Sequence, residues 1–245
     1  MPKTAGPLSI SFTDASIAEI MHWIEYTHPN QSRGTVIHLV NAYTLALASQ
    51  DSGLVAVLRD LNAVNLVDSF WLHKLLASRS DLKHGQIRGP SLFKEAITRA
   101  PHVVSARNHF LLGGTEAQAQ VIRSILEPFG KWGGSYAPAY GEADIDSCFA
   151  RISNVEPSVI WVCLGTPKQD FVAQRLNQKF PATYICVGAA LDFFTKEKNE
   201  APIWVRSIGM EWAFRFLQEP KRLWKRYLWG NGVFIGLALR YWFQK

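Results

Sequence analysis

Cysteine is scarce in this chain of 245 residues, and long apolar runs are missing. The three cysteines, Cys148, Cys163 and Cys186, are odd in number and widely spaced, which argues against a disulfide framework or a zinc cluster and favours a reducing, cytoplasmic compartment. The first residues carry no apolar stretch of the kind that a signal peptide needs, so we expect a protein that is not exported. Arg240 interrupts the most apolar stretch, 233–239, so we expect no spanning helix.

The motifs of several enzyme classes are also missing. The seven histidines form no H-x-H or H-E-x-x-H pair, and neither G-x-S-x-G nor G-x-x-x-x-G-K-[ST] occurs. These absences argue against zincins, α/β-hydrolases and P-loop enzymes. A D-x-D pair, Asp144 and Asp146, lies in what looks like the acidic first turn of a helix. Side chains at i and i+2 of a helix diverge by about 200°, so we predict no metal site there.

Short apolar strands alternate with helix-like segments along residues 1–203. Five runs rich in β-branched or aromatic residues each end in a polar or glycine turn, namely 35–40, 63–67, 109–112, 159–164 and 183–187. This alternation predicts an α/β fold with a largely parallel, Rossmann-like sheet and helices on both faces. Ligands of such folds bind at the carboxyl ends of the strands.

The excess positive charge lies in residues 204–245. This segment carries eight basic side chains against two acidic ones, together with five of the nine tryptophans, whereas residues 1–203 are balanced in charge. We predict one helix from about Ile203 to Gln218 and another from Lys221, with aromatic and basic side chains on separate faces. Such a composition is typical of a segment that lies on anionic lipid. We therefore divide the chain into an α/β domain, 1–203, and a helical, membrane-associating appendage, 204–245.

Two other interpretations of this segment stay open. The aromatic side chains could pack the helices onto the core and leave a solvated basic face. Aromatic and arginine side chains together also bind single-stranded nucleic acid. The neutral remainder of the chain and the lack of a known nucleic-acid motif argue against that last interpretation, so we expect no nucleic-acid partner.

The residues that follow the five strands are the candidate ligand contacts. They are Asn41, Asp68, Gly113, Gly114, Thr115, the segment Gly165 to Gln169 and, a little beyond Gly188, Asp192. The Gly-Gly-Thr turn would offer free backbone N–H groups to a phosphate at the start of a helix. Lys168 adds a cation, and Gln169 can bond to sugar hydroxyls. The set suits a phosphorylated sugar, although ordinary strand-to-helix turns explain the same residues.

Two charged residues allow more than one interpretation. Asp68 follows an apolar strand and precedes a helix-like segment, so its carboxylate could be the N-cap of that helix or a catalytic base at the mouth of the strand. Arg88 precedes a helix that we expect to begin at Leu92. A guanidinium there is well shaped for a bidentate phosphate contact, although a surface arginine is the commoner outcome.

Read in order, these motifs resemble those of the WecG/TagA/CpsF family of bacterial glycosyltransferases, from about residue 8 to about residue 235. The segment 164–170, LGTPKQD, is similar to the family's G-x-P-K-Q-E turn, and 187–193, VGAALDF, to its V-G-x-x-F-D-F strand end. The family signature A-P…G-L-E-W…R…E-P-x-R-L-x-x-R-Y is matched by residues 201–202, 209–212, Arg215 and 218–227.

Some positions differ from the family pattern. Leu39 stands where the family often has threonine, and Ser69 where it usually has glycine. The segment 134–141, which includes Tyr140, is similar to the tyrosine- and proline-rich loop of the capsule and exopolysaccharide branch. That likeness points away from N-acetylmannosamine as the sugar. The two altered positions leave open an alternative role as a non-catalytic, membrane-associated nucleotide-sugar-binding or scaffold protein.

The resemblance implies an inverting, metal-independent enzyme without a cofactor, whose catalytic domain is 1–203. It would transfer a sugar from a UDP-sugar to a polyprenyl-diphosphate-linked saccharide at the inner face of the cytoplasmic membrane. Asp68 matches the family's proposed catalytic base. Asn41 and Gln169 would orient the sugar, and Asp192 would bond to the nucleoside. The candidates for stabilising the departing diphosphate are Arg88, the amides of 113–115 and a basic side chain of the C-terminal segment.

The remaining expected contacts are of two kinds. Further substrate contacts are expected from Tyr140, Gly165 and Lys168. Membrane or acceptor contacts are expected from the C-terminal segment, at Arg215, Lys221, Arg222, Trp224, Lys225 and Arg226. The resemblance is also compatible with a homo-oligomer.

Overall fold

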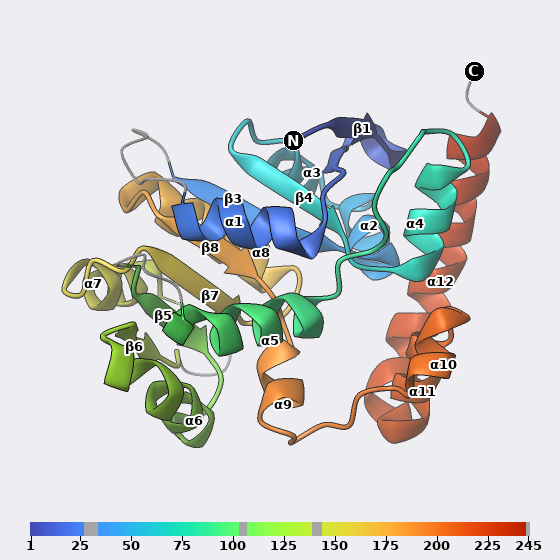
Figure 1. The fold of residues 1–245 in the computed structure, drawn as a ribbon. Coiled ribbons are helices and arrows are strands. Elements are labelled where there is room, and N and C mark those ends of the chain that lie inside the picture. Colours follow the sequence, from blue (N-terminus) through green and yellow to red (C-terminus); the bar gives the residue numbers. More distant parts are fainter. Residues whose placement is uncertain (27–33, 103–106, 139–143, 244–245) are drawn as a thin grey trace.

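A six-stranded sheet forms the centre of the computed structural model, which describes residues 1–26, 34–102, 107–138 and 144–243 (Figure 1). Its strand order is β4-β3-β8-β7-β5-β6. The strands are β3 (Thr35–Val40), β4 (Ala63–Val67), β5 (His109–Gly113), β6 (Trp132–Tyr136), β7 (Val159–Cys163) and β8 (Thr183–Cys186). All five pairings are parallel, so the carboxyl ends of the strands lie along one edge. The predicted α/β class is confirmed, and the five expected strands end within one residue of their predicted bounds.

Three strands were not expected from the sequence. β6 contains two adjacent glycines, which have low strand propensity, and it lies at the edge of the sheet against β5 alone. Its second half occupies the start of the segment 134–141 that the sequence suggested as a loop. The other two strands form a separate antiparallel pair near the N-terminus, β1 (Lys3–Ala5) and β2 (Ser11–Thr13), joined through the short helix η1 (Pro7–Ser9).

Helices cover both faces of the sheet (Figure 1). The side chains of Ile37 and Leu39 pack with α1 (Ile17–Tyr26), α5 (Gly89–Arg99) and α6 (Glu116–Leu126). Val36 and Val40 point to the opposite face, where α2 (Ala42–Ala48), α3 (Ser52–Leu58), α7 (Ile145–Ser153) and α8 (Lys168–Lys179) pack. Burial on both faces explains why the strands are almost wholly apolar. The remaining short elements are η2 (Ala100–His102), η3 (Glu127–Phe129), α4 (Phe70–Ala77) and α9 (Ala190–Phe194).

The C-terminal segment forms three helices, α10 (Ile203–Ser207), α11 (Glu211–Gln218) and α12 (Pro220–Phe243). The single helix predicted from Ile203 to Gln218 is therefore wrong. The chain breaks at Gly209, whose φ of +75° favours glycine and where a Cβ would lie 2.4 Å from Phe70 Cδ1. The second predicted helix is present and begins at Pro220.

Helix α12 packs lengthwise on α2. Its Phe234 and Leu237 are buried in the same cluster as Leu45 of α2 and Leu54 of α3. Part of the aromatic and apolar content of 204–245 therefore belongs to the core, while other side chains of the segment, Trp204 and Leu228 among them, are exposed. Within the described ranges, each helix is too short or too polar to cross a lipid bilayer.

Candidate active site

Asp68 lies directly after β4, at the carboxyl edge of the sheet. Its backbone N–H donates to the Val40 carbonyl at 2.8 Å and so extends the pairing of β4 with β3 by one residue. Its side chain does not cap the following helix, because the Ser69 hydroxyl accepts the Leu72 N–H and is the N-cap of α4. The N-cap interpretation of Asp68 is therefore wrong for α4, and the carboxylate is free to contact other elements.

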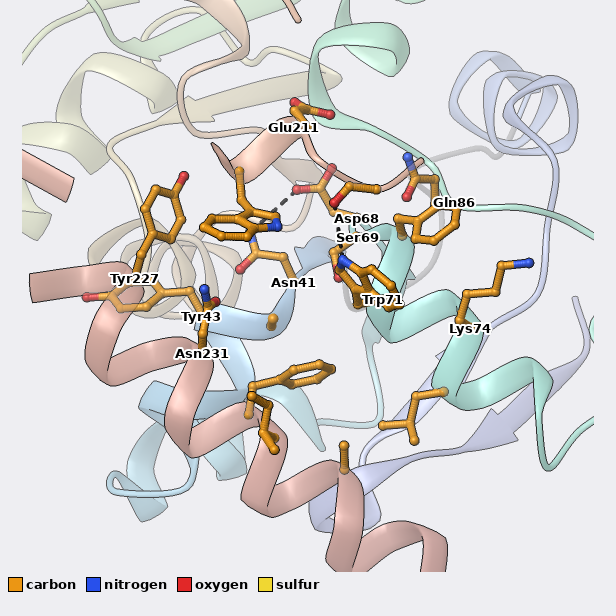
Figure 2. Close-up of a pocket in the computed structure, with 18 of the residues that line it drawn as sticks. Asn41, Tyr43, Asp68, Ser69, Trp71, Lys74, Gln86, Glu211, Tyr227 and Asn231 are labelled. Carbon is orange, nitrogen blue, oxygen red and sulfur yellow. Dashed lines mark hydrogen bonds between the residues drawn. The ribbon is translucent and has the colours of Figure 1, made fainter. Parts of the chain in front are cut away.

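Two groups hold the carboxylate of Asp68. The N–H of Gly89, the first residue of α5, donates to Oδ1 at 3.0 Å. The side-chain amide of Asn41 donates to Oδ2 at 3.5 Å (Figure 2). Asn41 is itself fixed, because it is the N-cap of α2 and shares a capping box with Thr44. Asp68 is thus positioned from the starts of two helices that face it.

The surroundings of Asp68 raise its pKa to about 6. Burial is the main cause, because it disfavours the charged form; Arg215 lowers the pKa and Glu211 raises it. At neutral pH the carboxyl group is then mostly ionised, and it is a stronger base than an exposed aspartate. These two properties together are what a general base requires.

Asp68 and Asn41 lie at one end of a cavity of about 700 Å³. Residues of α4, of α12 and of the turn that joins α10 to α11 line the cavity, and Figure 1 shows α4 beside α12 with α10 and α11 next to them. Many of the lining residues were not singled out from the sequence, among them Tyr43, Trp71 and Asn231. Aromatic residues on a helix look like core residues in a sequence, and only the polar Asn231 within an otherwise apolar part of α12 could have signalled this face.

Three arginines of the C-terminal segment line the same cavity, and two of them, Arg215 and Arg226, are among the predicted contacts. Arg215 donates to Glu211 at 2.6 Å and its guanidinium lies 4.9 Å from the Phe193 ring centroid. The Arg226 guanidinium lies 4.1 Å from the Tyr43 ring centroid. The Nε atoms of both arginines are buried without a hydrogen-bond partner among the described residues. Such donors are suited to an anionic ligand.

Arg88 has a different environment from the one expected. Helix α5 begins at Gly89, three residues before the predicted start, so Arg88 is its N-cap residue. The buried guanidinium makes a bidentate pair with Glu211, at 2.9 and 3.1 Å, and also donates to Glu200 at 2.9 Å. Arg88 does not line the cavity. Its contacts tie α11 to the start of α5, next to Asp68.

The glycine turn after β5 has the geometry expected for the start of a helix. Gly113 and Gly114 have φ values of +104° and +81°, and Thr115 is the N-cap of α6 in a capping box with Gln118. The Gln118 amide also donates to Asp192 Oδ1 at 3.1 Å, which links this turn to α9. Asp192 is paired on its other side with Lys198 at 2.7 Å.

Gln169 is buried and fully engaged with the protein. Its Oε1 accepts the Gly188 N–H at 2.9 Å, and its Nε2 donates to Thr166 Oγ1 at 3.1 Å. The side chain therefore fixes the turns after β7 and β8 and is not turned toward the cavity. Gly165 and Lys168 lie at the same turn, before and at the start of α8.

The structure thus divides the predicted site residues into groups. Asn41, Asp68, Arg215 and Arg226 line one cavity, whereas Gly113, Gly114, Thr115, Gly165, Lys168, Gln169 and Asp192 lie at neighbouring strand ends outside its lining. Arg215 stands between the groups, because it contacts both Glu211 and Phe193. The other predicted membrane or acceptor contacts are exposed and do not line the cavity; they are Lys221, Arg222, Trp224 and Lys225. Tyr140 lies outside the described residues.

The D-x-D pair does not form a common site. Asp144 is the N-cap of α7 and accepts the N–H groups of Asp146 and Ser147 at 3.1 and 3.2 Å. Asp146 instead pairs with Lys179 of α8. The two carboxylates therefore bond to different partners, and Asp144 precedes the helix on which it was expected to lie.

Residues 6–245, almost the whole chain, match the glycosyl transferase WecG/TagA/CpsF family. The chain belongs to this family. This confirms the resemblance seen in the motifs and makes the protein a glycosyltransferase. As a member of the WecG/TagA/CpsF family, it is also similar to the N-acetylglucosaminyldiphosphoundecaprenol N-acetyl-beta-D-mannosaminyltransferase of Bacillus subtilis (strain 168), with 26% identity over 227 residues. The match covers 90% of this chain and 85% of the relative.

Proposed function

We propose that this glycosyltransferase moves a sugar from a UDP-sugar to a polyprenyl-diphosphate-linked saccharide, by a single inverting displacement that needs no metal ion. The observation that carries the proposal is the carboxylate of Asp68, with a pKa of about 6, at the end of a cavity that Arg215 and Arg226 also line. The name of the Bacillus subtilis relative supports the acceptor class, because it specifies a saccharide linked to diphosphoundecaprenol.

In the proposed reaction Asp68 accepts the proton of an acceptor hydroxyl while the oxygen attacks the anomeric carbon of the donor. The new glycosidic C–O bond forms on the face opposite the leaving group, and the bond from the anomeric carbon to the diphosphate breaks. UDP departs with that electron pair. One such displacement inverts the configuration at the anomeric carbon. The proton that the acceptor hydroxyl loses ends on the carboxylate of Asp68.

Negative charge on the departing diphosphate has to be stabilised without a metal. Arg215 and Arg226 both line the cavity. The Nε–H of each is buried and donates to no acceptor among the described residues. Fixed cations at the position where charge develops lower the barrier, because they need no reorganisation during the reaction. Arg88 is already paired with two carboxylates, so we assign it to holding α11 in place.

The donor nucleotide is proposed to bind at the neighbouring strand ends. The Thr115 N–H donates to Gln118 Oε1 at 2.9 Å, so a phosphate would bind the other N–H groups of the Gly113–Thr115 turn at the start of α6. Asp192 is held next to this turn by Gln118 and would accept from the nucleoside. Arg215 contacts Phe193 of the same short helix, so it connects the donor side with the cavity that contains Asp68.

A panel of UDP-sugars tests the proposal. Each is titrated by calorimetry and then supplied with an acceptor saccharide on polyprenyl diphosphate, and UDP release is measured. We expect at least one UDP-sugar to bind and to be transferred, with UDP release that depends on the acceptor. Binding of a UDP-sugar without any acceptor-dependent release would instead favour the non-catalytic alternative.

Chelation of divalent ions separates the metal-independent mechanism from a metal-assisted one. We expect the transfer rate in EDTA to equal the rate without it, because arginine side chains take the role of the metal in this site. The matched measurement adds Mn²⁺ after the chelator. A loss of activity in EDTA that Mn²⁺ restores would contradict the proposal and would bring Asp144 and Asp146 back into consideration.

The exposed face of the C-terminal helices is proposed to rest on the inner surface of the cytoplasmic membrane. Trp204 and Leu228 are exposed, and Lys221 and Lys225 lie on the first turns of α12 near them in the sequence. Apolar side chains beside basic ones are typical of contact with anionic lipid, where each basic residue contributes about 1 kcal/mol.

The double variant Lys221→Glu/Lys225→Glu is expected to lower co-sedimentation with anionic vesicles by about tenfold or more, because two attractive charges become repulsive. The matched control Lys83→Glu/Lys94→Glu changes the net charge equally at exposed positions outside the segment. It should bind vesicles as the unmodified protein does. Equal vesicle binding by both double variants would show that this face is not the membrane contact.

A further inference from the structure

The cavity that contains Asp68 has two chemically different ends. Near Asp68 it is polar and carries three arginines, Arg206, Arg215 and Arg226. Farther along α12 the lining becomes apolar, with Phe234, Ile235, Ala238, Leu239 and Trp242, and Leu75 of α4 faces this part. From Arg226 to Trp242 a helix rises by about 24 Å. The cavity is therefore a long groove whose apolar part starts beside the catalytic group.

Hydrogen bonds join the elements that line the groove near each of its ends. At the Asp68 end, the Trp71 indole N–H donates to the Gly209 carbonyl at 3.1 Å. At the other end, Arg79, just after α4, donates to the Tyr241 carbonyl of α12, and the Tyr241 hydroxyl donates to the Ala5 carbonyl at 2.7 Å. Helix α4 is thus tied to the turn between α10 and α11 at one end of the groove and to α12 at the other end.

The rim of the groove exposes large apolar side chains. The exposed fractions are 51% for Trp71, 58% for Ile235, 54% for Leu239 and 53% for Trp242. A continuous exposed apolar surface of this kind is unfavourable in water and marks a binding surface. Lys74 also lines this stretch, and its alkyl stem can lie along apolar surface while its ammonium group stays in water. The apolar part of the groove therefore still suits a hydrocarbon.

We propose that the apolar part of the groove between α4 and α12 binds the polyprenyl chain of the acceptor, at the isoprene units nearest to the diphosphate. This inference rests on the proposed function. The acceptor carries a hydroxyl, a diphosphate and a hydrocarbon chain in that order along the molecule. The groove offers the base Asp68 within a polar end, and then an apolar channel, in the same order. The match of charge and polarity along one continuous groove selects this ligand over a second copy of the chain.

The consequence for the mechanism is that the protein, and not the bilayer alone, positions the lipid-linked saccharide. A chain seated in the groove fixes the acceptor's own diphosphate at the polar end of the groove and so limits the orientations of the acceptor hydroxyl at Asp68. Positioning of this kind converts binding energy from a remote part of the substrate into rate. The groove also explains why α12 is packed on the core as one wall of the groove and is not a detached membrane anchor.

Binding of a prenyl diphosphate of four isoprene units, with no sugar and no vesicles present, tests the inference on the full chain. Ala238→Phe places a ring into the groove, and Ile235→Asp puts a charge on its exposed rim, where it does not disturb the core. Gly236→Phe is the matched control, because Gly236 lies outside the lining and has open space around it. Calorimetry gives the dissociation constants, and a thermal melt verifies that each variant is folded.

We expect Ala238→Phe and Ile235→Asp to weaken binding by tenfold or more, since each buried methylene that is displaced costs about fourfold in affinity. Gly236→Phe should bind as the unmodified protein does. Inorganic diphosphate should bind more weakly than the prenyl diphosphate and should be insensitive to Ala238→Phe. Equal affinity of all four proteins for the prenyl diphosphate, or no binding by the unmodified protein, would overturn the inference.

Two further readouts distinguish the inference from its alternatives. Sedimentation shows whether the groove is instead an interface between copies of the chain; a dimer that Ala238→Phe dissociates would overturn the proposal. Transfer assays separate the inference from the proposed function. Prenyl binding at the groove without any sugar transfer would contradict the proposed function alone, whereas transfer with a KM for the lipid acceptor unchanged by Ala238→Phe would contradict the groove alone.

Discussion

Replacement of Asp68 by asparagine is expected to abolish measurable transfer, with a loss of about 10²–10⁴-fold in rate, the range that a general base contributes. The amide can still accept the Gly89 N–H that now bonds to Oδ1, so the site keeps its shape while it loses the base. We therefore expect the affinity for the UDP-sugar to change by no more than a few fold. Initial rates with the lipid-linked acceptor and calorimetry with the donor measure the two quantities.

The neighbouring residue supplies the matched control. Ser69→Ala removes the N-cap of α4, which costs about 1 kcal/mol of folding free energy, but it leaves the carboxylate and its two hydrogen bonds in place. This variant should melt at a lower temperature and still transfer sugar. Near-normal turnover of the Asp68→Asn protein would remove Asp68 from the mechanism.

Arg226→Ala is expected to lower kcat/KM by about 10²–10³-fold, the usual cost of removing one group that stabilises charge in the transition state. Arg226 is held above the Tyr43 ring and lines the cavity, so its charge is fixed where we place the diphosphate. Arg226→Lys should recover only part of the rate, because an ammonium lacks the planar guanidinium that stacks on the ring.

The control for this variant is Arg240→Ala, which removes one exposed arginine from the same helix at a position outside the cavity lining. In an assay without vesicles it should change kcat/KM by less than about twofold. Comparable losses for the two alanine variants would mean that the arginines of α12 act through the overall charge of the helix. That result would leave the departing diphosphate without its proposed partner.

The strands and the position of Asp68 could be predicted because they depend on local sequence. A buried parallel strand is a short apolar run, and a polar residue at its end lies at the edge of the sheet wherever the other strands are. This argument found Asp68 and Asn41, which the structure brings into contact at 3.5 Å. It failed for β6, where two glycines hide the strand pattern.

The partners of the polar side chains could not be predicted, because they come from distant parts of the chain. Arg88 looks available for phosphate in the sequence, but Glu211, far along the chain, takes its guanidinium in a bidentate pair. Gln169 looks available for a sugar, but it bonds to Gly188 after the next strand. The pairing of a side chain is a property of the folded molecule, and a motif indicates only which side chains are present.

The C-terminal segment shows the same limit. Its basic and aromatic composition predicted an interface, yet composition cannot tell which aromatic side chains face the core and which face the cavity. Phe234 is buried in the core cluster and also lines the groove, whereas Trp204 is exposed. The break at Gly209 decides this division, because it turns α11 toward Arg88 and Asp68.

The pH dependence of kcat/KM for the lipid-linked acceptor tests most directly whether Asp68 is the base. The pKa of Asp68 is raised to about 6 from an ordinary value of 3.8, mainly by burial, and only the ionised form can take a proton from the acceptor. The rate should therefore rise about tenfold per pH unit below pH 6 and level off above pH 7. A rate that stays constant between pH 4.5 and pH 7, or one that rises only above pH 8, would contradict the assignment.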